Sequence, residues 1–303
     1  MARQRLTWFT SSLLTSKQED RRCKLCGGEL NYLFEKTGED KKPYPLYSCN
    51  DCHCWQIYPL PSEEYLHSLY QDKYFKKRTK RGYANYLSPE VKKSIQSTFK
   101  KNLSDLGFFS FSQTLSQKNA LEVGCAAGFF VEYLQKLGWS SKGIDIAEEM
   151  IEVGKSNGLD LYCDDYLEKD FEEKFQLISF WATLEHLSNP LSFLKKMKQD
   201  LAENGVIYLS TCHLGIFAKV YGTQWRYLNV PEHLFYFSIK SLERLAEQAD
   251  LKVAHTFTYG SGLTAKPELG LPYSILKGFG DWAAKTTGQG DMIVCRLEHL
   301  ANK

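Results

Sequence analysis

The sequence predicts an α/β protein: a seven-stranded, Rossmann-like sheet with helices on both faces, preceded by a small cysteine-rich module. Two observations predict it. From about residue 119 onward, short apolar segments alternate with amphipathic ones, which is the pattern of parallel strands joined by helices. Before that point, four cysteines stand in two closely spaced pairs.

Length, composition and charge limit the domain organisation and the kinds of partner that are possible. The 303 residues suffice for one large domain and a small one, and 43% hydrophobic and 24% charged residues are ordinary for a globular protein in water. Residues 1–110 carry 19 Lys and Arg against 12 Asp and Glu, whereas the remainder carries 19 against 24. A basic front half is consistent with an anionic partner or with an ordinary solvated face, and both interpretations stay open.

The N-terminus and the cysteine count bear on location. No apolar run approaches the roughly 18 residues that cross a bilayer. Residues 1–20 have a broken apolar stretch and no small-residue cleavage site, so we expect a mobile tail rather than a signal peptide. Nine cysteines without a secretory signal indicate a reducing compartment, and we therefore expect a cytoplasmic protein.

The paired cysteines have the spacing of a structural metal site. Two C-x2-C turns, 22 residues apart, each bring two thiolates to one ion, and zinc prefers four such ligands in a tetrahedron. The expected ligands are Cys23, Cys26, Cys49 and Cys52. His53 and Cys54 could substitute, but the set is complete without them and leaves no open position for catalysis. Residues 21–60 are therefore predicted to form a zinc ribbon.

Residues 61–118 are predicted to be a polar, helical connector. The segment that begins at Pro61 is typical of a helix start, and a second amphipathic helix is expected from Pro89 to Leu106. Between them, six of the nine residues from Lys73 to Arg81 are basic.

Seven strands are expected in the domain that covers residues 119–303. They are 120–124, 141–146, 159–163, 175–181, 206–210, 251–259 and 292–297. The helices expected between them are 129–137, 147–156, one that Asn189-Pro190 opens and Asn204-Gly205 closes, and one over 239–249. In such a sheet the ligand lies outside the carboxyl ends of the strands.

The stretch LEVGCAAGFF, residues 121–130, follows the first of these strands. A dinucleotide loop needs G-x-G-x-x-G to seat a pyrophosphate on a helix N-terminus. The segment Gly124–Gly128 has no third glycine at the usual place, which disfavours a pyrophosphate.

This stretch resembles the first motif of class I S-adenosylmethionine-dependent methyltransferases, an acidic residue followed by G-x-G-x-G. Ala126 replaces the middle glycine, which is tolerated if its φ stays negative. Asp145 ends the second strand, where a carboxylate can accept both ribose hydroxyls. The resemblance continues through 164–166, 175–187, 231–238 and 288–291, and it includes a bacterial subgroup that carries an N-terminal zinc ribbon. It implies that the following residues bind the cofactor: Glu122, Gly124, Cys125, Ala126, Gly128, Asp145, Ile146, Asp164, Asp165, Tyr166 and Trp181.

Three histidines are candidates for catalysis, because transfer to a hydroxyl requires a base. His186 follows the fourth strand, His213 follows the fifth, and His233 lies before the next helix. Each can equally be structural. Glu185 and His186 partly match an E-x-x-E-H metal set, but Ala182 occupies the first glutamate position, so no catalytic metal is expected.

The predicted function is methyl transfer from S-adenosylmethionine to a small molecule or sugar, with O-methylation favoured. Five aromatic residues could line the acceptor pocket or belong to the core: Tyr208, Phe217, Tyr221, Trp225 and Tyr227. One alternative is an RNA methyltransferase that grips phosphates through the ribbon and the basic connector. Another is an inactive binding module, since a fold alone does not fix function.

Residues 260–290 are a long insertion between the last two strands. Pro272 is predicted to open a short helix with Ile275, Leu276, Phe279 and Trp282 on one face. Three interpretations remain open: a helix packed on the domain surface, a lid that closes over the acceptor, or a membrane contact.

Overall fold

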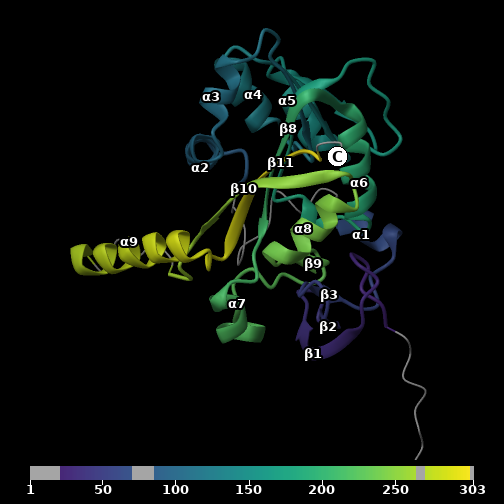
Figure 1. Ribbon diagram of the computed structural model, residues 1–303, viewed down its shortest axis with the longest axis vertical. Coiled ribbons are helices and arrows are strands. Elements are labelled where there is room, and N and C mark those ends of the chain that lie inside the picture. The colour runs from purple at the N-terminus through teal and green to yellow at the C-terminus, as the bar shows by residue number, and fades with distance from the viewer. Residues whose placement is uncertain (1–20, 70–84, 264–269, 301–303) are drawn as a thin grey trace, which may run out of the picture.

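The protein contains two sheets, of seven and four strands (Figure 1). The computed structural model describes residues 21–69, 85–263 and 270–300. In the large sheet the strands are β4 (Asn119–Val123), β5 (Ser140–Asp145), β6 (Asp160–Cys163), β7 (Phe175–Trp181), β8 (Leu201–Cys212), β10 (Leu251–Tyr259) and β11 (Met292–His299). Their order is β10-β11-β8-β7-β4-β5-β6. The predicted seven-stranded α/β fold is therefore confirmed.

Helices cover both faces of this sheet and alternate with its strands (Figure 1). They include α4 (Phe129–Lys136), α5 (Glu148–Ser156), α6 (Pro190–Asp200) and α8 (Ile239–Glu247). The strands β4 to β8 pair in parallel, so their carboxyl ends meet at one edge. The expectation of a parallel sheet fails at β11, which is antiparallel to both β8 and β10 because the chain doubles back after β10.

The end of α6 differs from the prediction. Asn204-Gly205 was expected to close this helix, but α6 ends at Asp200 and both residues lie within β8. Leu201 already pairs with Phe175 of β7. A Cβ at Gly205 would lie 2.9 Å from the Phe175 carbonyl oxygen, so this glycine permits a close approach of the two strands rather than a helix end.

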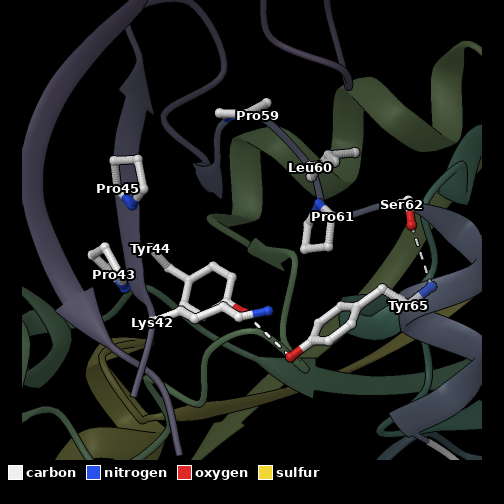
Figure 2. Close-up of a pocket in the computed structure, with 9 residues that line it drawn as sticks. All are labelled: Lys42, Pro43, Tyr44, Pro45, Pro59, Leu60, Pro61, Ser62 and Tyr65. Carbon is white, nitrogen blue, oxygen red and sulfur yellow. Dashed lines mark hydrogen bonds between the residues drawn. The ribbon is translucent and has the colours of Figure 1, made fainter. Parts of the chain in front are cut away.

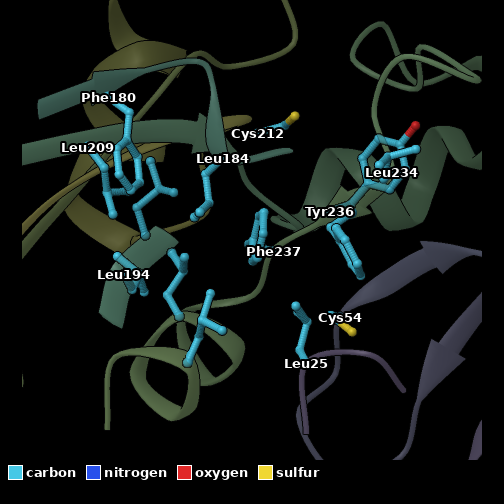
Figure 3. Packing of buried hydrophobic residues seen from close by; sticks show 14 of the residues in the cluster. Leu25, Cys54, Phe180, Leu184, Leu194, Leu209, Cys212, Leu234, Tyr236 and Phe237 are labelled. Atoms are coloured by element: carbon cyan, nitrogen blue, oxygen red, sulfur yellow. The ribbon is translucent and has the colours of Figure 1, made fainter. Parts of the chain in front are cut away.

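The small sheet joins the ribbon to the large domain. Its strands are β1 (Leu30–Thr37), β2 (Pro43–Cys49), β3 (Trp55–Ile57) and β9 (Phe235–Tyr236), in that order. Trp55 pairs with Tyr236, and the Ile57 N–H donates to the Leu234 carbonyl at 3.0 Å. Figure 3 shows one continuous apolar core running from Phe180 of β7 to Leu25 of the ribbon. A strand from the expected large domain thus completes the ribbon sheet; the division at residues 60 and 118 stays a prediction.

Three helices form the described part of the connector: α1 (Glu63–Leu69), α2 (Pro89–Asp105) and α3 (Phe108–Gln113). Ser88 caps α2 by accepting a hydrogen bond from the Val91 N–H, and Phe99 and Leu103 on its apolar face are buried, as predicted. The basic run from Lys73 to Arg81 lies outside the described residues.

The insertion forms α9 (Gly270–Thr287), which is longer than expected and stands away from the body in Figure 1. Its predicted apolar face is exposed to solvent, with Phe279 63% and Trp282 62% accessible. The helix contacts the domain surface through its opposite face, so the predicted apolar face is not the one that packs. Asp281 accepts from Ser261, and the Ala284 carbonyl accepts from Thr258 of β10. The lid interpretation stays a prediction.

The described helices include none that is both long and apolar enough to cross a membrane.

Candidate active site

The loop after β4 owes its shape to two glycines. Gly124 and Gly128 have φ of 72° and 74°, in the left-handed region that favours glycine. A Cβ on Gly124 would lie 2.6 Å from the Thr183 side chain, and one on Gly128 would lie 2.8 Å from Leu159. Side chains at either position would therefore both strain the backbone and clash with a neighbour, so the loop can follow this path only with glycine there.

Ala126 departs from the expectation. Its φ is +45°, so the assumption of a negative φ is wrong. In this conformation the Ala126 N–H donates to Asp145 Oδ2 at 2.8 Å, and this hydrogen bond helps to hold the left-handed turn. A non-glycine residue in this region carries about 1–2 kcal/mol of strain.

Asp145 ties the loop to the end of β5. Its Oδ1 accepts from the Ala147 N–H at 2.9 Å while Oδ2 accepts from Ala126. Burial raises its pKa above the ordinary value, although these two backbone donors oppose the shift. Each carboxylate oxygen has a second lone pair, so the group can hold the loop and still accept from a ligand hydroxyl.

Glu122 is buried in β4 with one oxygen unsatisfied. It lies opposite Gly143 of β5 and Ser179 of β7, and it accepts a hydrogen bond from the Val131 N–H. Burial raises its pKa well above the ordinary value. Its Oε2 has no protein partner, and neither have the Ser179 hydroxyl and the Trp181 indole N–H. Buried polar atoms without partners are rare, so this group of three indicates a place for polar atoms of a ligand beside the glycine loop.

The other predicted cofactor residues differ in their exposure to solvent. Cys125 is buried, Ile146 is 40% exposed, and Asp164 and Asp165 are exposed. The Asp164 N–H donates to the Asp145 carbonyl at 3.2 Å, which brings this segment to the same edge. Tyr166 is buried, and its hydroxyl donates to Asp200 of α6 at 2.8 Å, so this group serves the core.

Two of the candidate histidines lie together. The rings of His186 and His233 pack edge to face with centroids 4.7 Å apart. His186 follows β7 in a short 3-10 turn (Leu184–His186), and its Nδ1 lies 2.8 Å from the Glu232 carbonyl oxygen. Because a carbonyl only accepts, Nδ1 carries the proton and Nε2 carries the lone pair. This is the tautomer that a general base requires.

A buried polar cluster supports His233. Its Nδ1 lies 3.2 Å from Cys212 Sγ, which in turn lies 3.6 Å from Glu185 Oε1. Thr211 donates to the other Glu185 oxygen at 2.8 Å. Burial raises the pKa of the Cys212 thiol well above the ordinary value, so the sulfur keeps its proton and can donate. Sequence reasoning missed Cys212, whose only signal is its position at the end of β8.

The same cluster bears on the question of a catalytic metal. Ligand atoms of Glu185, Cys212 and His233 lie within 4.8 Å of one another, which is compact enough for an ion. Cys212 also lies within hydrogen-bond distance of both other side chains, and Ala182 offers no ligand from the first position of the E-x-x-E-H set. These contacts form a clamp that joins the turn after β7, the end of β8 and the loop before β9. The absence of a catalytic metal stays a prediction.

His213 is separate from the histidine pair in its contacts. It is buried, its Nδ1 lies 2.8 Å from the Gly290 carbonyl, and its backbone N–H donates to the Asp291 carbonyl. Burial lowers its pKa, which favours the neutral ring. These contacts fix the end of β8 to the connection before β11, so its evident role is structural.

The predicted aromatic pocket is not a single surface. Tyr208 is buried against Phe108, on the side of the sheet that α3 covers, and its hydroxyl donates to the Leu106 carbonyl. Trp225 is buried in the other core cluster, where its indole N–H donates to Asp291 at 2.7 Å. Both belong to the core. Phe217, Tyr221 and Tyr227 retain partial exposure.

A cavity of about 400 Å³ lies between the ribbon and α1 (Figure 2). The hydroxyls of Tyr44 and Tyr65 both donate to Asp40 Oδ2, at 2.7 and 2.8 Å. Prolines 43, 45, 59 and 61 contribute much of the wall. None of the predicted cofactor residues lines this cavity, which is therefore distinct from the strand-end site.

The four predicted zinc ligands form one cluster. Their sulfur atoms lie within 4.8 Å of one another, with Cys26 to Cys49 at 3.4 Å and Cys23 to Cys52 at 3.7 Å. Sulfurs 2.3 Å from a tetrahedral zinc are about 3.8 Å apart, so the donor set fits the ion. Cys54, expected to be a bystander, lies 3.4 Å from Cys23 as a buried fifth thiol, whereas His53 is exposed.

Comparison with known proteins agrees with this fold. Residues 84–256, more than half of the chain, match the family described as methyltransferase domain. The chain therefore belongs to the methyltransferase-domain family and is an enzyme of that class.

Two named relatives and one solved structure are similar to this chain. The ubiquinone biosynthesis O-methyltransferase of Haemophilus ducreyi is 30% identical over 167 residues, covering 48% of this chain and 71% of that protein. The protein of the same name from Hydrogenovibrio crunogenus is 25% identical over 178 residues, covering 54% and 72%. A SAM-dependent methyltransferase structure from Archaeoglobus fulgidus gives a TM-score of 0.50 at 12% identity, covering 68% of this chain and 93% of that one. That structural likeness concerns the fold alone.

Proposed function

We propose that this protein transfers the methyl group of S-adenosylmethionine to a hydroxyl of a small-molecule acceptor. The observation that carries the cofactor assignment is the strand-end site, where a glycine loop, the Asp145 carboxylate and the unsatisfied Glu122 oxygen come together. The relatives named O-methyltransferase support oxygen as the acceptor atom and a small molecule as the acceptor.

The residues of this site fit the cofactor. Gly124 and Gly128 keep the loop free of side chains where the ligand must approach. Asp145 accepts from the ribose hydroxyls, and Glu122 offers a buried acceptor to the charged amino group at the methionine end. The cofactor supplies an electrophilic methyl group on a sulfonium.

The catalytic part of the proposal rests on the histidine pair. His186 accepts the hydroxyl proton through Nε2, because its Nδ1 proton is committed to the Glu232 carbonyl. His233 packs against this ring and orients it, and the clamp of Glu185 and Cys212 holds His233 in turn. His213 is assigned no step.

The ribbon completes the proposal. We infer that Cys23, Cys26, Cys49 and Cys52 bind one structural zinc ion, because their sulfurs already have the required spacing. A cytoplasmic location fits the nine cysteines, none of which forms a disulfide. The alternative of an RNA acceptor depends on the basic run from Lys73 to Arg81, which lies outside the described residues. No contact among the described residues favours this alternative.

A transfer assay tests the function. Purified protein is incubated with methyl-labelled S-adenosylmethionine and, separately, with phenols and catechols, with sugars and with RNA. Label is expected in a hydroxyl compound of low molecular weight. Label found in RNA alone, or no binding of S-adenosylmethionine by calorimetry, would contradict the proposal.

The base is tested by His186→Ala. Turnover should fall by about 10²–10⁴-fold, while binding of S-adenosylhomocysteine stays unchanged because His186 is not among the cofactor residues. His53→Ala, an exposed histidine on the ribbon, is the matched control and should behave as the wild type. Unaltered turnover in His186→Ala removes this residue from the mechanism.

A further inference from the structure

The exposed apolar side chains of this protein are concentrated on two helices. In the described part of the chain, thirteen large apolar residues are exposed, and eight of them lie on α9 or on α7 (Ile216–Tyr221). The eight are Ile216, Val220, Tyr221, Leu271, Ile275, Leu276, Phe279 and Trp282. Single exposed apolar residues are normal on a protein surface, but a group of this kind marks an interaction site.

The two faces of α9 differ sharply. Its inner face is bound to the body: Asp281 accepts from Ser261, Ala284 is buried, and Lys285 pairs with Asp105 of α2 at 2.6 Å. Its outer face carries Leu271, Ile275, Phe279 and Trp282 at successive spacings of four, four and three residues, with Leu276 beside them. This is the spacing of a seam that packs against another helix.

Within the described part of the chain, this seam is left uncovered. The five side chains are 57–73% exposed, and none of the charged residues of α9 lies among them. They leave on the order of 600 Å² of apolar surface in water, as much as the largest patch on a typical monomer. Figure 1 shows that α9 projects beyond the body of the protein.

We propose that α9 is a dimerisation helix whose outer seam packs antiparallel against the same seam of a second copy. A two-fold arrangement makes the seam its own partner. Pairing two seams buries on the order of 1,200 Å², the lower limit of specific interfaces. Gly278 borders the seam with open space around its Cα, which lets the two helices approach closely.

Charge favours a second copy over a lipid surface. Helices that bind membranes add attraction to anionic lipids through lysines and arginines on their polar face. Both lysines of α9 are paired with carboxylates instead, Lys277 with Asp281 and Lys285 with Asp105. Self-packing of the seam, by contrast, places no charge in the interface.

Sedimentation equilibrium of the full chain tests the proposal. The wild type is expected to show a monomer–dimer equilibrium with a dissociation constant on the order of micromolar. The double variant Ile275→Glu, Phe279→Glu should weaken association at least about a hundredfold, because the dimer would bury four unpaired carboxylates. Ser274→Glu adds one carboxylate to the same helix outside the seam and should leave association within about threefold of the wild type.

Folding is checked in each variant by circular dichroism and thermal unfolding. Since both substituted residues are exposed in the monomer, unfolding of the monomer should be unaffected. A wild type that stays monomeric throughout, or a double variant that dimerises as tightly as the wild type, overturns the proposal. So does a monomer that floats with vesicles of phosphatidylcholine and phosphatidylglycerol and loses this binding in the double variant, since the seam would then face lipid.

Discussion

The Cys212 sulfur lies 3.2 Å from Nδ1 of His233, and this contact fixes a candidate catalytic ring against the end of β8. The thiol is buried and keeps its proton, which it donates to Glu185, so its sulfur can accept from His233 Nδ1 without adding charge to the site. His233 is therefore oriented from one side by the sheet and from the other by the ring of His186. The pair is therefore positioned jointly by the end of β8 and by the loop before β9, which carries both Glu232 and His233.

Replacing Asp145 by alanine should weaken binding of S-adenosylmethionine at least tenfold, because a hydrogen bond to a charged group contributes about 1.5–3 kcal/mol. Calorimetric titration measures it. Asp160→Ala is the matched control, since Asp160 is an exposed carboxylate at the start of β6, away from the carboxyl ends of the strands. Equal affinity in the Asp145 variant and the wild type would rule out this carboxylate as a ribose ligand.

Ala126→Gly should raise the free energy of unfolding by about 0.5–1 kcal/mol. Relief of about 1–2 kcal/mol of left-handed strain outweighs the added chain entropy of glycine in the unfolded state. The neighbouring Ala127→Gly is the control: this residue has no positive φ, so the same change should destabilise by about 1 kcal/mol. Urea unfolding gives both values, and a loss of stability in Ala126→Gly would contradict the role assigned to its φ.

Glu122 should make stability depend on pH in a defined direction. Burial raises its pKa in the folded protein above the ordinary value of 4.5, so the folded state favours the neutral acid. Its contribution to stability is greatest below about pH 4.5 and is lost as the pH rises through the raised pKa.

Glu122→Gln keeps the shape and removes the charge. The variant should be more stable than the wild type at pH 8 and equally stable near pH 4, when unfolding by urea is compared across this range. Glu148→Gln, an exposed residue of α5, should follow the wild type at every pH. A constant difference between Glu122→Gln and the wild type at all pH values would show that this group does not titrate on unfolding.

The ribbon should bind one zinc ion per chain, and the fifth thiol provides a control. Cys52→Ser is expected to lose the ion, whereas Cys54→Ser should retain it, because the four sulfurs grouped for an ion do not include Cys54. Metal analysis of the purified variants distinguishes them. Loss of zinc from Cys54→Ser with retention in Cys52→Ser would mean that Cys54 is the ligand instead.

Local sequence signals were sufficient to predict the strands in most of the large domain. The strands β4, β5 and β7 lie within one or two residues of their predicted bounds, because short apolar runs between turn glycines leave little choice of register. The glycine loop and Asp145 were selected through the resemblance to the methyltransferase motif, and their role as cofactor ligands stays a prediction. The structure brings both to one edge of the sheet, where consecutive parallel strands have their carboxyl ends.

Features that depend on long-range packing were missed. The two-residue strand β9 has no periodic signal, and its pairing with β3 joins positions about 180 residues apart in the chain. The positive φ of Ala126 is held in part by its contact with Asp145 and does not reflect its own preference. For α9, periodicity found the apolar face but could not say whether the body of the protein covers it.

The pairing of β3 with β9 means that the ribbon cannot be treated as a removable cassette. A chain that began at residue 61 would leave β9 with an unpaired edge and would uncover Phe235 and Tyr236, both fully buried in the intact protein. An exposed apolar strand edge is a template for aggregation. Because β9 directly follows His233 and Leu234, the same truncation would also release the segment that carries His233, one of the two paired histidines. Chimaeras of this enzyme should therefore exchange ribbon and β9 together.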